Sequence, residues 1–163
     1  MDSRQALKSG INGANHLIDT YLGDLSDADL LVRAIPGTNH IAWQLGHLIQ
    51  AEHFMVEKVC PGSMPKLPEG FKQQHTTETA ASDDPKAFLT KDQYLALFKE
   101  QRAATLAALA KMSDADLDKP VPPPLDKMWK RAGDVFAMQG THWVMHAGQW
   151  AIIRRKLGHK PLF

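Results

Sequence analysis

A chain of 163 residues predicts one domain over residues 1–163, long enough to bury a core without a disulfide or a structural metal. The formal net charge of +1 comes from interspersed acidic and basic residues, which leave no basic stripe for nucleic acid, and Cys60, the only cysteine, excludes an internal disulfide. Every apolar run is too short to span a membrane and the first residues lack the apolar core of a signal peptide, so we expect no membrane partner and a cytoplasmic location.

The first predicted helix covers about residues 3–22. Its apolar residues, from Leu7 to Ile18, recur at spacings of three and four, and Gly23 gives the helix a stop. Such a stripe buries one side of a helix against other elements, so we expect this segment to face a core.

A second helix is predicted over about residues 40–59, with Thr38 or Asn39 as its N-terminal cap and Pro61 beyond its end. Residues 60–89 carry four prolines and a polar run, which predict a connection with at most short helical pieces. A connection of this length reaches across the full height of a helical bundle. We therefore expect the second and third helices to run parallel.

The third helix is predicted over about residues 90–112, because Thr90 and Gln93 form a capping box ahead of residues in helical register. The sequence Ser-Asp-Ala-Asp-Leu at residues 113–117 repeats the one at residues 26–30. Either an internal duplication or the commonness of Ser-Asp caps accounts for this repeat, and the sequence does not decide between them. A duplication would make the two histidine-bearing helices structural counterparts.

The fourth helix is predicted over about residues 133–157 and ends at Gly158, with basic residues at 154–156 that suit the negative end of its dipole. No segment alternates polar and apolar residues as a half-buried strand would. The predicted fold class is therefore all-α, and its simplest architecture is a four-helix bundle.

His142 and His146 stand four residues apart in the fourth helix, so both imidazoles point from one face of it, one turn apart. Two such nitrogens are half of a first-row metal site, although a chain with eight histidines holds such a pair by chance rather often. Trp143 follows His142, which excludes the His-Glu-x-x-His motif of zinc proteases.

His47 is the candidate third ligand, because it lies in an apolar stretch of the second helix directly after Gly46, a residue that lets a ligand or another backbone approach closely. The alternative is that His47 is a hydrogen-bonded core residue. Three converging imidazoles would leave one or more metal positions for water or substrate, as in catalytic sites.

The other histidines fit a metal site less well. His40 lies two turns from His47 on nearly the same face and is expected to line the mouth of a pocket, whereas His53 points elsewhere and is expected at the surface or against a loop. The remaining three have no local partner and are expected to be ordinary: His16, His75 and His159.

Four features of the chain are shared with a known family: Trp43-Gln-Leu-Gly-His47-Leu-Ile-Gln-Ala-Glu52; His142-x-x-x-His146-Ala-Gly-Gln149; Arg154 or Arg155; and Leu157-Gly158. In these features the chain resembles the DinB/YfiT-like superfamily, over essentially its whole length. The resemblance implies a four-helix bundle in up-down-down-up order, with a long connection between the second and third helices, that is often a homodimer. It also implies a divalent metal, usually zinc or nickel, held by His47, His142 and His146.

Members of that family include metal-dependent thiol S-transferases, a maleylpyruvate isomerase and the bundle domain of sulfoxide synthases, and the family name does not imply DNA binding. The leading hypothesis is therefore a metal-dependent enzyme of the thiol S-transferase type. It would act on a small-molecule substrate with a low-molecular-weight thiol as cofactor. Gln149, one turn from His146, is the candidate cofactor-binding residue, through a contact either with a metal ligand or with the pocket. The alternatives are a metal-dependent hydrolase, a non-catalytic bundle that binds a metal or a small ligand, and a purely structural bundle.

Overall fold

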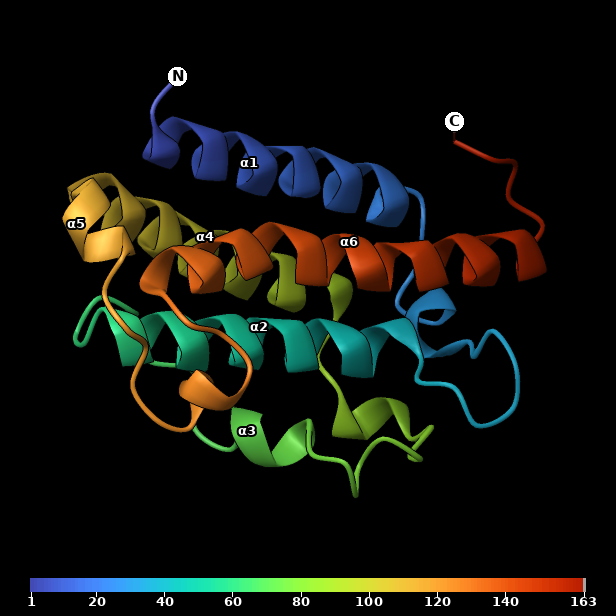
Figure 1. The fold of residues 1–163 in the computed structure, drawn as a ribbon. Helices are drawn as coiled ribbons and strands as arrows, with labels where there is room; N and C mark the ends of the chain where they lie inside the picture. The colour runs from blue at the N-terminus through green and yellow to red at the C-terminus, as the bar shows by residue number, and fades with distance from the viewer. Residues whose placement is uncertain (163) are drawn as a thin grey trace.

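The computed structural model describes residues 1–162, and its regular structure is helical (Figure 1). The four long helices are α1 (Ser3–Leu22), α2 (Ile41–Val59), α4 (Lys91–Lys111) and α6 (Ala132–Lys156). Shorter pieces lie between them: the 3₁₀ helices η1 (Asp29–Leu31), η2 (Pro85–Ala87) and η3 (Leu125–Lys127), and the α-helices α3 (Phe71–Gln74) and α5 (Asp114–Leu117). No β-strand occurs within residues 1–162, so the all-α prediction is confirmed, with two short α-helices beyond the predicted four.

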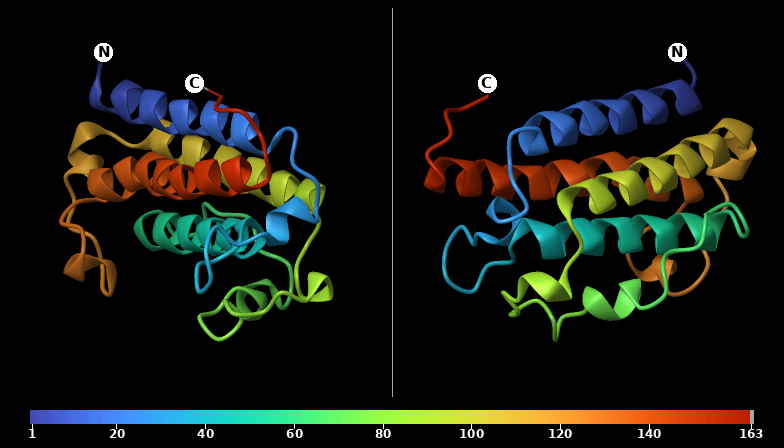
Figure 2. Two further views of the ribbon diagram at one scale, coloured as in Figure 1. Left: turned by 90° about the vertical axis from the view of Figure 1, so that its right-hand side faces the viewer. Right: turned by 180° about the vertical axis from the view of Figure 1, so that it is seen from behind.

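Helix α6 lies between α1 and α2, and α4 packs behind them (Figure 1). The colour gradient shows α1 and α6 running in one direction along the molecule and α2 and α4 in the other. Figure 2 shows the connection between α2 and α4, with α3 and η2, folded over the side of α2 that faces away from α1. Helix α2 is therefore covered on two sides, and its first six residues, 41–46, are all buried.

Local capping chemistry fixes the helix starts. The Thr90 and Gln93 capping box begins α4 as predicted, with the Thr90 N–H donating to Gln93 Oε1 at 2.9 Å and the Gln93 N–H to Thr90 Oγ1 at 3.3 Å. The predicted cap of α2 at Thr38 or Asn39 was wrong. His40 caps this helix instead, because its Nδ1 accepts the Trp43 N–H at 3.1 Å.

The two Ser-Asp-Ala-Asp-Leu segments form the same local structure. In each, the serine Oγ donates to the carboxylate of the aspartate three residues on at 2.7 Å, and that aspartate's N–H donates back to the serine Oγ. One segment leads into η1 and the other forms α5. Reciprocal capping by these residue types is enough to produce the likeness.

A buried ion pair lies in the centre of the bundle. Arg102 of α4 and Glu52 of α2 are 3.0 Å apart, Nη2 to Oε2, and the two side chains are 3% and 1% exposed. Thr105 Oγ1 and Trp143 Nε1 donate to the same carboxylate at 2.7 and 3.0 Å, so α2, α4 and α6 meet there. Burial raises the pKa of Glu52, and the Arg102 guanidinium opposes that shift.

The basic residues at the end of α6 stand in its last turn, as predicted, and one of them has a further role. Arg154 is buried and donates from Nη1 to the Tyr21 carbonyl at 2.8 Å and from Nη2 to Asp24 Oδ2 at 2.9 Å. It thus fastens the end of α6 to the end of α1.

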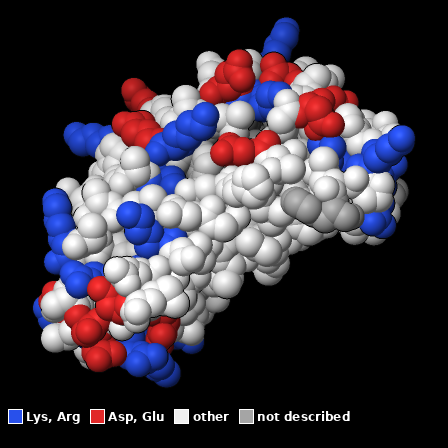
Figure 3. All heavy atoms as spheres, turned by 90° about the horizontal axis from the view of Figure 1, so that it is seen from above, with Lys and Arg blue, Asp and Glu red and all other residues white. Residues whose placement is uncertain are grey.

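Part of the surface carries no charge. A groove of about 540 Å³ between α1 and α6 is lined only by uncharged residues, among them Gly10, Gly140, Val144 and Met145. Figure 3 shows a broad uncharged band on this side of the molecule, with the charged side chains gathered mainly beyond it. None of the helices described is both long and apolar enough to cross a membrane.

Candidate metal centre

The packing of α2 against α6 brings three histidines together. His47 of α2 faces His142 and His146 of α6, and one ring nitrogen of each lies within 4.8 Å of the others. The ring centroids are 5.3 Å apart for His47 and His142, 5.6 Å for His47 and His146, and 5.0 Å for His142 and His146. No other group of three His, Cys, Asp or Glu side chains converges in this way within residues 1–162.

Gln44 determines which nitrogen of His146 is free. The Trp150 indole can only donate, and its Nε1 lies 2.9 Å from Gln44 Oε1, so this oxygen is an acceptor. The same oxygen lies 2.9 Å from His146 Nδ1, which must therefore carry a proton. His146 Nε2 is then left with its lone pair for a ligand bond, the second-layer arrangement found around histidines that bind metals.

The cluster is electrostatically suited to neutral imidazoles. Burial, with a contribution from the other rings, lowers the pKa of His142 and that of His146 to about 4. Burial also lowers the pKa of His47. The lowered pKa values favour the uncharged form of all three rings, which is the form that binds a metal.

The donor set fits a divalent transition metal. Three imidazoles at bond lengths of about 2.0–2.1 Å form a three-coordinate base with further positions open, as in catalytic zinc sites. The nitrogens lie no more than 4.8 Å apart, so small ring rotations would reach the spacing of about 3.4 Å that tetrahedral bonds require. Imidazole nitrogen suits zinc and nickel alike.

Trp43 supports the cluster from the preceding turn of α2. Its ring stacks on His47 with centroids 5.2 Å apart and an interplanar angle of 5°. The indole Nε1 donates to the Thr76 carbonyl at 3.0 Å, which ties this stack to the α2–α4 connection. Trp43 thus restricts the rotation of the His47 ring.

Comparisons with known proteins identify the family and the fold of this chain. The family model described as the DinB superfamily matches residues 12–150. The chain belongs to the DinB superfamily. A crystal structure of a conserved protein from Enterococcus faecalis has the same fold, with a TM-score of 0.70, 16% sequence identity, and coverage of 97% of this chain and 99% of that one. No curated protein matches the chain.

Gly46 of this DinB chain was predicted to let a ligand or another backbone approach, and a side chain lies there instead. Neither a ligand nor a backbone approaches it, because the ring of His75 lies there, and a Cβ on Gly46 would be 2.0 Å from His75 Cδ2. His75 is 2% exposed, with Nδ1 2.8 Å from the Phe71 carbonyl and Nε2 2.7 Å from the Tyr94 hydroxyl. The expectation that His75 is ordinary was wrong, since it fastens the α2–α4 connection to α2 and α4.

The structure places the remaining candidates as follows. His40 does not line a pocket mouth: it is fully buried, and its Nε2 is 3.0 Å from the Ser82 carbonyl. His53 contacts Gln101 of α4, and His159 pairs with Asp24 at 3.0 Å. Gln149 is exposed and accepts from Gln44 Nε2 at 3.2 Å, so it contacts the residue that orients His146.

Sequence reasoning missed Gln44, although it sits inside the run that carries the family resemblance. A glutamine among apolar helix residues is a signal in itself, because a buried amide requires partners.

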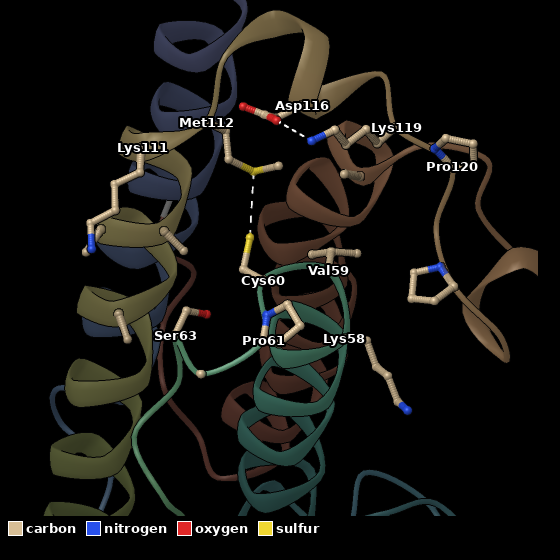
Figure 4. Close-up of a pocket in the computed structure, with 16 residues that line it drawn as sticks. Lys58, Val59, Cys60, Pro61, Ser63, Lys111, Met112, Asp116, Lys119 and Pro120 are labelled. Atoms are coloured by element: carbon tan, nitrogen blue, oxygen red, sulfur yellow. Dashed lines mark hydrogen bonds and ion pairs between the residues drawn. The ribbon is translucent and has the colours of Figure 1, made fainter.

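Cys60 belongs to a separate cavity of about 580 Å³ between the C-terminal ends of α2 and α4 and the start of α6 (Figure 4). Its thiol points toward Met112, with Sγ 3.8 Å from Sδ, whereas Lys58 and Lys111 extend away from the cavity. Burial, followed by the nearby Asp116 and Glu57 carboxylates, raises the pKa of the Cys60 thiol. This thiol is therefore a poor nucleophile at neutral pH.

Proposed function

We propose that this DinB-superfamily protein is a metal-dependent enzyme of the thiol S-transferase type, with one divalent ion, zinc or nickel, held by His47, His142 and His146. The observation that carries the metal site is the convergence of three neutral imidazoles, one of which has its free nitrogen selected by Gln44. The transferase type rests on the family resemblance. When bound at such a centre, the ion lowers the pKa of a coordinated thiol and keeps it as the nucleophilic thiolate.

The chain's own residues would hold and orient this centre. Gln44 keeps the proton of His146 on Nδ1, and Gln149 accepts a hydrogen bond from the Gln44 amide, which supports a role for Gln149 as a positioning residue. Trp43 covers one face of His47. These contacts fix ring directions before any ligand arrives, as tight metal binding requires.

The metal site is tested by elemental analysis of protein purified without added metal. We expect about one divalent ion per chain in the wild type and a loss of this ion in His146→Ala. His16→Ala removes an exposed histidine of α1 and serves as the matched control that keeps the metal. Full metal content in His146→Ala would refute the three-histidine site.

The reaction type is tested on cobalt-substituted protein. A coordinated thiolate should add a charge-transfer band to the cobalt spectrum, and a thiol with an electrophilic acceptor should then turn over in a metal-dependent way. Ester hydrolysis without a thiol would favour a metal-dependent hydrolase. Metal binding with neither activity would favour a non-catalytic binding protein.

The finer description of the fold is also part of this proposal. We assign the four long helices to an up-down-down-up bundle and propose a homodimer, in keeping with the resemblance. The uncharged groove between α1 and α6 is the face offered to the second copy, since burying apolar surface favours association. Sedimentation should give a dimer for the wild type and a monomer for Met145→Glu, and a monomeric wild type would refute it.

A further inference from the structure

A cavity of about 680 Å³ opens beside His47, under the connection between α2 and α4. One wall is a single face of α2, with His47, Gln50, Ala51 and Phe54 at helical spacing. The opposite wall comes from the connection and from α3, through Leu67, Pro68, Lys72 and Gln73, and His53 completes the lining. The volume is in the range of small-molecule sites. The cavity therefore shares His47 with the histidine cluster.

Two polar side chains that line this cavity have an acceptor without a partner, Gln50 and His53. Gln50 Oε1 has no hydrogen-bond partner among the described residues, a condition that costs about 1–3 kcal/mol for a neutral polar group, but it has less than 1 Å² of accessible surface, so a ligand reaches it only after the side chain turns. The second acceptor is His53 Nε2. The amide N–H of Gln101 donates to the Pro65 carbonyl at 2.9 Å, so the amide oxygen is the atom that faces His53. This oxygen lies 3.1 Å from His53 Nδ1 and accepts a hydrogen bond from it. The proton of His53 is then on Nδ1, and Nε2 carries the lone pair.

The charge and polarity of the lining residues further restrict the chemical class of the ligand. Lys72 is the one charged residue that lines the cavity, and no aspartate or glutamate lies among its lining residues. Phe54, 40% exposed, forms an apolar surface with Leu67 and Pro68. An anionic ligand with an apolar body would therefore meet the attractive charge of Lys72 and an apolar surface within this lining.

We propose that this cavity binds a small organic anion that has an apolar body and N–H or O–H donors. The donors pair with His53 Nε2 and, once its side chain has turned toward the cavity, with Gln50 Oε1. The anionic group pairs with Lys72, and the apolar body covers Phe54. His47 and Phe54 are seven residues apart, about 10 Å along α2, which suits a molecule of roughly dipeptide length. That this ligand is the substrate of a metal at His47 rests on the proposed function, but its binding does not.

The test is a titration of metal-free protein followed by two-dimensional amide NMR. The probe is N-benzoylglycine, which has a ring, an amide N–H and a carboxylate, and its neutral partner is N-benzoylglycinamide. We expect saturable shifts in the α2 face and in residues 67–73, and a preference of about threefold or more for the anion, the size of one exposed ion pair.

Three variants separate the contributions of Lys72 and Gln50 to the binding of the probes. Lys72→Gln should abolish the preference for the anion, whereas Lys66→Gln, an exposed lysine of the same connection outside the cavity lining, should keep it. Gln50→Leu should weaken both probes by a similar factor. Shifts outside the cavity, equal affinity for the two probes, or equal effects of the two lysine variants would overturn the proposal.

The same samples distinguish this inference from the proposed function. Addition of cobalt(II) should broaden the probe's proton signals in wild type and leave them sharp in His146→Ala. If cobalt does not bind, the proposed function fails while the metal-free titration still decides the cavity. If cobalt binds but the probe does not, the cavity proposal fails alone.

Discussion

Gln44 makes four hydrogen bonds with one side-chain amide. Its oxygen accepts from His146 and Trp150, and its nitrogen donates to the Asn39 carbonyl and to Gln149. Both lone pairs of the amide oxygen and both protons of the amide nitrogen are thus in use, in a side chain that is 1% exposed. A residue held in this way keeps one orientation, and it keeps the proton of His146 on Nδ1.

Gln44→Leu should weaken metal binding by about 10–100-fold, because His146 loses the partner that fixes its free nitrogen. It should also lower the free energy of unfolding by about 1–3 kcal/mol, since the Trp150 N–H loses its acceptor. Competition with a chromogenic chelator measures the affinity. Gln149→Leu, which removes only one partner of Gln44, should have a much smaller effect; equal losses in the two variants would contradict the role given to Gln44.

The metal-free protein should lose stability as the pH falls from about 6.5 to about 4. The pKa of His142 and that of His146 are about 4 in the folded protein, against an ordinary value of 6.5. Between these values the unfolded chain binds more protons than the folded one, so the free energy of unfolding decreases with falling pH. Urea midpoints across this range should fall less steeply in His142→Asn than in wild type, and parallel curves would contradict the lowered pKa.

At the scale of elements, the contact between His75 and Gly46 decides how the α2–α4 connection sits on α2. The His75 ring occupies the space where any other residue at position 46 would place its Cβ. Phe71, 1% exposed, anchors the same segment in the core. A long connection without such anchors would lie loosely on the surface.

Gly46→Ala should therefore destabilise the protein by about 1–3 kcal/mol through overpacking, even though alanine favours a helix by about 1 kcal/mol over glycine. Gly13→Ala is the matched control, because nothing lies within 4 Å of a Cβ at Gly13 in α1. This control should gain up to about 1 kcal/mol. Urea denaturation measures the unfolding free energy of both variants. The double variant Gly46→Ala/His75→Ala should recover part of the stability that Gly46→Ala loses. A Gly46→Ala variant as stable as the wild type would refute the close packing.

The sequence predicts the elements well and their long-range contacts poorly. The bounds of α1 follow from its apolar spacing and those of α4 from the Thr90 box, because both signals are local. The burial of His40 and the clamping role of His75 could not be predicted, since each depends on a segment more than 18 residues away, at Ser82 and at Tyr94. The convergence of His47 with His142 was predicted from the sequence motif. The role of Gln44 in orienting His146 follows only from its contact with Trp150 in the structure.

At the scale of the whole molecule, the Glu52–Arg102 pair ties α2 to α4 at the centre of the bundle, and Trp143 joins α6 to it. Arg102 also donates to the Gln139 carbonyl of α6 at 3.0 Å. Two buried charges are stable together because each is the other's main partner, and removing one leaves the other uncompensated.

Arg102→Met should cost about 3–5 kcal/mol of unfolding free energy at neutral pH. The loss should be smaller at pH 5 than at pH 8, because burial already raises the pKa of Glu52 and a protonated carboxyl needs no counter-charge. The double variant Glu52→Gln/Arg102→Met should recover most of the stability. Chemical denaturation at the two pH values measures this, and a pH-independent loss would show that the charge of Glu52 is not the cause.

The anchoring of the α2–α4 connection has a consequence for the kinetics of ligand entry. Residues 67–73 form one wall of the cavity beside His47, and Phe71 and His75 already hold that wall against α2. The wall is ordered when the chain folds, so a ligand loses no affinity to ordering a loop. Association should therefore be a single bimolecular step, with an observed rate that rises linearly with ligand concentration and reaches no plateau.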